Sequence, residues 1–264
     1  MKFFPQLVTG TLVQYPLVKR AVYRTIWNAA LDGSDDRLGD AGAERLEWEL
    51  RYEGLSREEQ ERLAAFHGEM EGRLGAFTFL DPTENLLERS GEPEASVWQK
   101  SPLLTLATGI PDPAGGTEAF RLISTGPVEQ SLQQVITAPG WFAYCWSVYA
   151  RSETAARVTL YRRSGTEEHA REFAVGRSWE RLVHSGKGES QEVTVWFGVK
   201  LRPGTAVELY GMQAEAQPAP SPYRRTKLRG GIYEGARFDE DELMVAAVGP
   251  DLHSCTVRIV KAGR

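Results

Sequence analysis

The sequence predicts a mainly β protein in which a small α+β domain with one helix is interrupted by an inserted β-sandwich or jelly roll. Three observations support this fold class. Residues 46–52 alternate between apolar and polar, residues 57–73 carry apolar side chains at helical spacing, and residues 101–217 hold short β-rich runs without helical periodicity. At 264 residues, the chain is long enough for two domains of ordinary size.

The first part of the chain, residues 1–97, contains the predicted helix and several strands. Ser56 and Glu59 have the spacing of a capping box, so the helix should begin at Arg57, and we expect it to continue to Arg73. Its apolar stripe consists of Leu63, Phe66, Met70 and Leu74. Strands are expected at Arg20–Trp27, Glu44–Tyr52 and Ala76–Leu80, with a loop at Asp32–Gly42 and a polar connector at 83–100.

The middle of the chain has the pattern of a sandwich, because Pro and Gly separate its apolar runs. The runs are Leu103–Ala107, Phe120–Ser124, Leu132–Thr137, Phe142–Ala150, Arg157–Arg162, Arg181–His184, Val193–Leu201 and Val207–Glu215. The proline-rich segment 217–222 then marks the exit from the sheets.

The last forty residues are too few for a domain of their own. Two strands are expected there, at 238–245 and 256–260, and we expect them to complete the sheet begun near the N-terminus. The predicted domains are therefore 1–97 with 223–264, which is discontinuous, and 98–222. Such an insertion is tolerated where its two ends lie close together.

Composition excludes several classes of protein. The net charge of -5 argues against a nucleic-acid partner, and no apolar run approaches the length of a membrane helix. The first residues have no apolar core of a signal peptide, so we expect no secretion signal. Cys145 and Cys255 form no CxxC motif, and a disulfide between them has little support without such a signal.

An enzyme is not predicted. The sequence has no P-loop, GxSxG, HExxH or GxGxxG motif, so no catalytic residue, metal ligand or cofactor is assigned. The acids Asp35, Asp36 and Asp40 could bind Ca²⁺, but their spacing does not fit an EF-hand. A glycan hydrolase would need two carboxylates facing each other across a cleft.

Aromatic residues are the candidates for binding a glycan, since sugar rings stack on aromatic faces. In alternation, Trp141 and Tyr149 lie on one face of a strand, and Tyr144 and Trp146 on the other. Large aromatics are usually buried, so each is first of all a candidate for the core. The full set of glycan-binding candidates is Trp141, Tyr144, Trp146, Tyr149, Trp179 and Trp196.

Two stretches outside the sandwich resemble a known family. The strand from Leu46, the helix after Ser56 and the run Gly75-Ala76-Phe77-Thr78-Phe79-Leu80-Asp81-Pro82 resemble bacteriophage tail-tip proteins of the distal-tail and DUF2460-like group. The segment Ala236–Val245 and the final strand to Val260 are similar to the closing strands of that family. The insert is similar to jelly-roll carbohydrate-binding modules of phage tail proteins, through the runs 133–136, 141–151, 207–215 and 221–226.

The resemblance implies a structural protein of the virion tail, assembled in the host cytoplasm without a signal peptide. Its implied partners are further copies in a homo-oligomeric ring, other tail or baseplate proteins and a host surface polysaccharide, with no nucleic acid and no membrane insertion. The alternative is a carbohydrate-binding adhesion module without a role in a ring. Candidate interface residues, which could equally be ordinary surface, are Asp35, Asp36, Glu47, Glu49 and Arg51.

Overall fold

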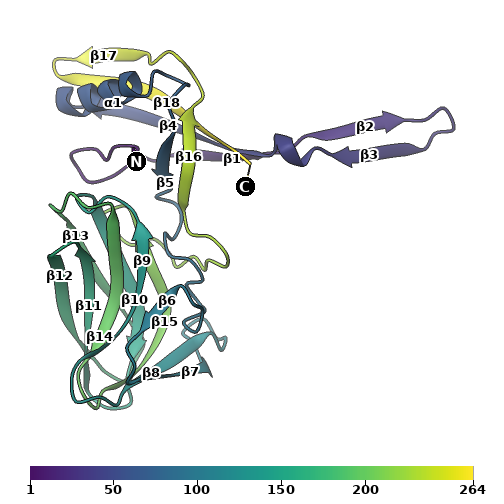
Figure 1. Ribbon diagram of the computed structural model, residues 1–264. Coiled ribbons are helices and arrows are strands. Elements are labelled where there is room, and N and C mark those ends of the chain that lie inside the picture. The colour runs from purple at the N-terminus through teal and green to yellow at the C-terminus, as the bar shows by residue number, and fades with distance from the viewer. Residues whose placement is uncertain (264) are drawn as a thin grey trace. The chain divides into compact units, whose positions relative to one another are not determined.

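The computed structural model describes residues 1–263, and the chain forms two compact units (Figure 1). Unit 1 consists of residues 1–79 and of those from 233 onward, and unit 2 of residues 80–232. The domain boundaries predicted from the sequence are 97/98 and 222/223. In the structure, residues 80–97 and 223–232 pack with the sandwich instead.

Unit 1 is built on one sheet and one α-helix. Its strands are β1 (Leu17–Val22), β4 (Arg45–Leu55), β5 (Phe77–Leu80), β16 (Ile232–Phe238), β17 (Val245–Gly249) and β18 (Leu252–Ala262). The sheet has the order β1-β4-β18-β16-β5, and β17 also pairs with β18. The C-terminal strand β18 thus lies between β4 and β16, so both ends of the chain build one sheet.

The strand and the start of the helix that the sequence predicted are confirmed. In β4, the side chains of Trp48, Leu50 and Tyr52 are buried, while the polar residues between them alternate to the other face. The helix α1 (Arg57–Glu69) begins with the capping box, in which the Ser56 hydroxyl accepts from the Glu59 amide.

The helix ends earlier than predicted, at Glu69 rather than Arg73. The chain turns there because Glu71 and Gly72 have φ angles of 51° and 60°. A Cβ on Gly72 would lie 2.8 Å from the Cα of Asp241, so the turn needs glycine at this position. Leu74, expected on the apolar stripe, is 69% exposed beyond the helix.

Aromatic rings fill the core of unit 1 between the helix and the sheet. Phe66 of α1 packs edge-on against Phe4 and Phe77, with ring centroids 6.0 and 5.3 Å apart. Trp48 of β4 packs on Phe79 of β5 at 5.2 Å. These contacts join the N-terminal segment, the helix and the sheet.

Three other predictions in unit 1 were wrong. The predicted loop at Asp32–Gly42 contains β3 (Asp35–Gly39), which pairs with β2 (Thr25–Ala29) in a separate two-stranded sheet. The predicted strand Arg20–Trp27 is split between β1 and β2, and the short 3-10 helix η1 (Ala41–Ala43) follows the hairpin. Residues 239–244 connect β16 to β17 instead of belonging to one predicted strand, and the Asp241 carboxylate in this connection accepts from the Arg73 amide at 3.0 Å.

Unit 2 is a sandwich of two five-stranded sheets. The first, the β10 sheet, has the order β13 (Glu180–Lys187), β10 (Ala143–Arg151), β15 (Ala206–Glu215), β8 (Ala119–Ser124) and β7 (Leu104–Ile110). The second, the β14 sheet, has the order β12 (Glu167–Val175), β11 (Ala156–Ser164), β14 (Thr194–Leu201), β9 (Gln130–Thr137) and β6 (Trp98–Lys100). This confirms the mainly β fold with a sandwich.

Two parts of unit 2 escaped the sequence analysis. Strand β12 lies at a sheet edge and is mostly exposed, so its charged sequence gave no apolar run. Residues 83–100 are no polar connector, since Leu86 and Leu87 are fully buried. The Asn85 side chain donates to the oxygen of Met212 at 2.9 Å and accepts from the amide of Ala214 at 3.1 Å, which fixes this segment against β15.

Candidate functional site

The outer face of the β10 sheet combines aromatic rings with charged side chains. We call it the tyrosine–arginine face. It consists of Tyr149, Trp179, Tyr210, Tyr223, Arg121, Arg151, Arg181 and Glu208.

Alternation along two neighbouring strands places these side chains outward. On β10, Tyr144 and Trp146 point into the core, so Tyr149 and Arg151 lie on the opposite face, where Tyr149 is partly exposed. Tyr149 pairs with Tyr210 of β15 and with Arg181 of β13. Three side chains from three strands therefore lie in one row across the sheet.

A β-bulge at Gly211 makes room for the rings. The register of β10 and β15 shifts between Ser147 and Tyr149, and Gly211 has a φ angle of 69°, which favours glycine. A Cβ on Gly211 would approach ring carbons of Tyr223 and Tyr149 to 3.1–3.3 Å. The glycine therefore allows Tyr223, from the segment after β15, to pack over the strand.

The rings form a connected aromatic surface. The centroid of Tyr210 lies 6.0 Å from that of Tyr149 and 5.3 Å from that of Tyr223. The guanidinium of Arg181 lies 5.4 Å from the Tyr149 ring, and that of Arg151 lies 4.7 Å from the Trp179 ring. Trp179, Tyr149 and Tyr210 are all partly exposed, so a planar apolar ligand face can stack on them.

Arginines outnumber the carboxylate on this face. Glu208 accepts from Arg121 at 2.5 Å and from Arg151 at 2.6 Å. Burial favours the neutral acid of Glu208, but these two hydrogen bonds outweigh it and keep its pKa below the usual value. The Arg181 Nη2 donates to the Ser147 hydroxyl at 3.0 Å, while its buried Nε has no partner among the described residues.

This chemistry suits binding better than hydrolysis. A glycosidase needs a carboxylic acid that holds its proton near neutral pH, whereas Glu208 is held ionised by two cations. The phenols are neutral donors, since burial raises the pKa of Tyr223 to about 12 and raises that of Tyr210. Neutral hydroxyls and guanidinium groups beside exposed rings can bind the hydroxyl and carboxylate groups of a sugar.

One end of the face is covered by the chain itself. Gln213 and Glu215 lie on the same side of β15 but are buried, because the segment 217–224 crosses them. The Glu215 carboxylate accepts from the amide of Ser221 at 3.1 Å, and the Gln213 side chain donates to the oxygen of Ser221 at 3.2 Å. The accessible part of the face is therefore the half with Tyr149 and Trp179.

The structure separates the glycan-binding candidates of the sequence analysis. Tyr144 and Trp146 are only 1% exposed and lie in the core, so they form no part of an exposed binding face. Tyr149 and Trp179 lie together on the tyrosine–arginine face. Trp196 lies outward on the β14 sheet beside Arg163, and Trp141 precedes β10 and packs on Phe142.

Tyr210, Tyr223 and the arginines were not among the residues predicted from the sequence. The alternation of residues 207–210 could have placed Glu208 and Tyr210 outward on their strand. The approach of Tyr223 could not be foreseen, since it depends on where the segment after the strand folds back.

The interface candidates lie in two places in unit 1. Asp35 and Asp36 are on β3, in the two-stranded sheet. Glu49 and Arg51 line an open groove of about 840 Å³ with Arg258 and Asp241, and Glu47 lies further along β4. Glu49 accepts from Arg51 at 2.9 Å and from Arg258 at 3.3 Å, so hydrogen bonding keeps the pKa of its carboxyl low.

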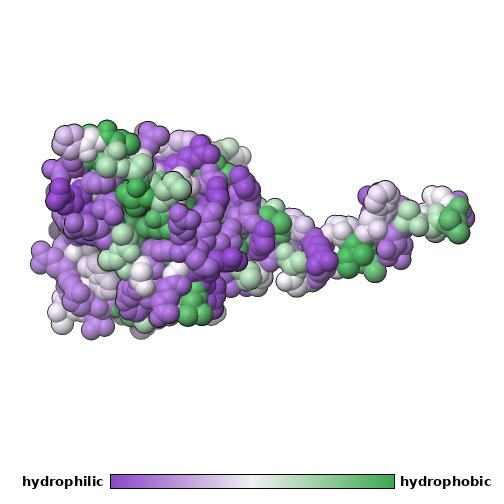
Figure 2. All heavy atoms as spheres, turned by 90° about the horizontal axis from the view of Figure 1, so that it is seen from above, coloured by the Kyte–Doolittle hydropathy of each residue, from purple (hydrophilic) through white to green (hydrophobic). Residues whose placement is uncertain are grey.

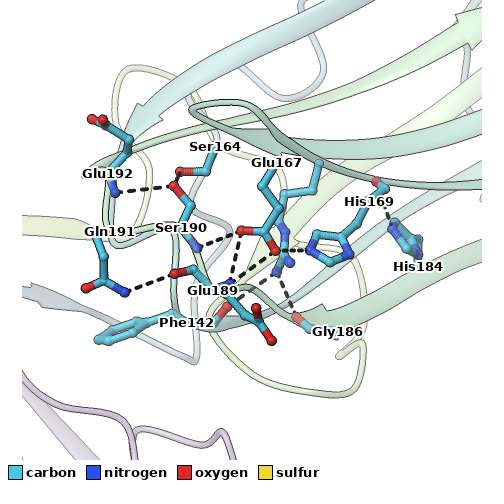
Figure 3. Close-up of polar contacts among 11 residues, drawn as sticks. Phe142, Ser164, Glu167, His169, His184, Gly186, Glu189, Ser190, Gln191 and Glu192 are labelled. Carbon is cyan, nitrogen blue, oxygen red and sulfur yellow. Dashed lines mark hydrogen bonds and ion pairs between the residues drawn. The ribbon is translucent and has the colours of Figure 1, made fainter.

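A second polar cluster in the sandwich holds a loop in place (Figure 3). The Glu167 carboxylate accepts from the amides of Ser190 and Glu189 and contacts the ring of His169. The His184 ring in turn donates to the oxygen of His169 at 3.1 Å. The Ser190 hydroxyl contacts Ser164 rather than His169, so the cluster lacks the geometry of a catalytic triad.

Residues 1–263 contain neither a metal-binding cluster nor a helix that could span a membrane. No three of their His, Cys, Asp or Glu side chains lie together as a metal-binding group would require. None of their helices has the length and apolar character needed to cross a membrane.

Comparison with known proteins gives only distant structural similarity. No protein-family model and no curated protein matches the chain. The family 22 carbohydrate-binding module of Clostridium thermocellum Xyn10B has a TM-score of 0.42 at 12% identity, over 53% of this chain and 99% of that one. The CBM22-1 xylan-binding domain of Paenibacillus barcinonensis Xyn10C has a TM-score of 0.39 at 17% identity, over 51% of this chain and 96% of that one.

A phage protein is among the similar structures. The enzymatically active domain of bacteriophage CBA120 tailspike protein 4 has a TM-score of 0.41 at 12% identity, over 52% of this chain. The match spans only 22% of that tailspike domain. Similarity at this level carries no argument about function.

Proposed function

We propose that the sandwich binds a carbohydrate, without catalysis, on the tyrosine–arginine face. The observation that carries this proposal is the set of rings on two strands, on the loop before β13 and on one returning segment, with arginine side chains beside them. Aromatic rings beside hydrogen-bonding groups suit the two sides of a sugar, its apolar C–H face and its hydroxyls. A polysaccharide of a host surface is the proposed ligand.

A matched pair of tryptophan substitutions tests the face. We expect the full chain to bind oligosaccharides on a glycan array, and calorimetry with the best of them should show binding about tenfold weaker or worse after Trp179→Ala or Tyr149→Ala. Trp196→Ala is the control, since Trp196 is also partly exposed and beside an arginine, but on the opposite sheet. Loss of binding in Trp196→Ala alone would move the site to the β14 sheet, and no binding to any glycan would reject the proposal.

We further propose that unit 1 assembles into an oligomeric ring of a phage or prophage tail tip, in contact with other tail or baseplate proteins. The observation that favours assembly is the exposed hairpin of β2 and β3, which carries large apolar side chains. Sedimentation of the purified chain and immunogold electron microscopy of tail particles test this role. A strict monomer that is absent from particles would leave the alternative, an adhesion module without a ring.

A further inference from the structure

The hairpin of β2 and β3, which we call the arm, pairs with no other strand among the described residues. It leaves the sheet of unit 1 and extends away from it (Figure 1). Its register places Ile26 opposite Leu38 and Trp27 opposite Arg37. Every residue of both strands is exposed, so neither face of the ribbon is covered by this chain.

The arm carries more apolar surface than an isolated ribbon should. Exposed fractions are 42% for Ile26, 64% for Trp27, 54% for Leu38 and 110% for Leu31 in the turn. Hydrophobic residues are distributed along the projecting arm as far as its tip, with hydrophilic residues between them (Figure 2). A two-stranded hairpin alone is marginally stable in water, and such a surface marks a contact with another protein.

The tip of the arm is acidic. Residues 29–36 include Asp32, Asp35 and Asp36 and no basic residue. The Asp32 carboxylate accepts from the hydroxyl of Ser34 at 2.7 Å and from its amide at 3.0 Å, and these bonds lower its pKa. Asp35 is paired with Arg37 at 2.8 Å, so the negative charge that the tip presents beside the apolar side chain of Leu31 comes from Asp32 and Asp36.

The chain also carries a surface of opposite charge. In the basic segment, residues 224–229, the side chains of Arg224, Lys227 and Arg229 are exposed and make no ion pair with other described residues. Leu228 stands among them, 71% exposed. The Lys227 oxygen accepts from the Arg89 amide at 3.0 Å and the Thr226 amide donates to the Ser90 hydroxyl at 3.0 Å, so the segment is fixed to unit 2.

We propose that the arm tip of one copy docks on the basic segment of a second copy. Aspartates of the tip meet arginine and lysine side chains of the segment, and Leu31 meets Leu228. The arm tip and the basic segment are different surfaces, so the contact is head-to-tail and closes into a ring or extends as a filament. This inference rests on the proposed assembly of unit 1 and names the surfaces that form it.

Charge reversal in the full chain tests the contact. We expect sedimentation to show an oligomer that weakens with salt, and a dissociation constant raised about tenfold or more in Asp36→Lys and in Arg229→Glu. Neither side chain has a partner among the described residues, so both variants should fold. Glu61→Lys, which reverses an exposed charge on α1, is the control and should associate normally.

The double variant Asp36→Lys with Arg229→Glu decides between this contact and a general effect of charge. Reversal of both surfaces restores their complementarity, so we expect association to recover at low salt. An oligomer that neither single variant affects, or a double variant that does not recover, would overturn the contact while leaving the ring intact. A chain that is monomeric at all salt concentrations would overturn the proposed ring as well.

Discussion

The indole of Trp146 on β10 donates a hydrogen bond of 3.0 Å to the main-chain oxygen of Gly198 on β14, and so joins the two sheets of the sandwich through its core. The same ring packs on Phe197 with centroids 6.0 Å apart. Position 198 favours glycine, because the Cβ of any other residue would lie 2.7 Å from the ring of Tyr161. One side chain thus contributes both apolar burial and the partner of a buried carbonyl.

Substitution of Trp146 should therefore be costly. We expect Trp146→Ala to lower the free energy of unfolding by about 3–5 kcal/mol, because it leaves a cavity and removes a buried hydrogen bond. Urea denaturation followed by circular dichroism measures this loss. Trp196→Ala, on a partly exposed tryptophan, should cost clearly less, and equal losses in both variants would contradict the assignment.

Acid should weaken the sandwich through His184. Burial lowers the pKa of His184 below 6.5, and the positive charge of Arg162 adds to the effect. The unfolded chain binds the proton more readily, so the stability that the neutral ring contributes is complete above 6.5 and is lost as the pH falls toward the folded pKa. Urea unfolding at about pH 7.5 and about pH 5.5 should show this decline, which His184→Asn should reduce. A decline of the same size in the variant would contradict this role.

Gly211 should be essential to the tyrosine–arginine face. Gly211→Ala places a Cβ at a left-handed φ and against the rings of Tyr223 and Tyr149, so we expect a loss of about 1–3 kcal/mol in stability. Carbohydrate binding should weaken in the folded fraction, as calorimetry can show. Gly204→Ala has a similar φ with open space around it, and it serves as the control because it strains only the backbone.

The two cysteines should be unreactive in the folded protein. Both thiols are free and buried, and burial raises the pKa of Cys145 to about 12 and that of Cys255 to about 11. A disulfide reagent that absorbs on thiol release should therefore react slowly until denaturant is added, and then with two thiols per chain. Rapid native reaction of either thiol would contradict this prediction.

The capping box of α1 should contribute measurably to unit 1. Ser56→Ala removes the hydroxyl that accepts from the Glu59 amide, and we expect a loss of about 1 kcal/mol in the free energy of unfolding. Ser56→Asp preserves an acceptor and should retain most of the stability. Thermal unfolding of the three proteins provides the comparison, and equal stability of all three would argue against the cap.

Local pattern by itself determined several elements of this protein. The strand at β4, the start of α1 at its capping box and most strands of the sandwich follow from side-chain periodicity, which depends only on neighbouring residues. The arm escaped detection because aspartate and glycine in Asp35–Gly39 have low strand propensity, and pairing with β2 outweighs it.

Only the tertiary structure decided which aromatic residues reach the surface. Trp146 and Tyr149 belong to one apolar run, yet one fills the core and the other faces outward beside Arg181. Periodicity divides a strand into two faces but does not say which face the second sheet covers. Tyr223 and Tyr210 meet only because Gly211 admits the returning segment, a contact between residues that no local pattern connects.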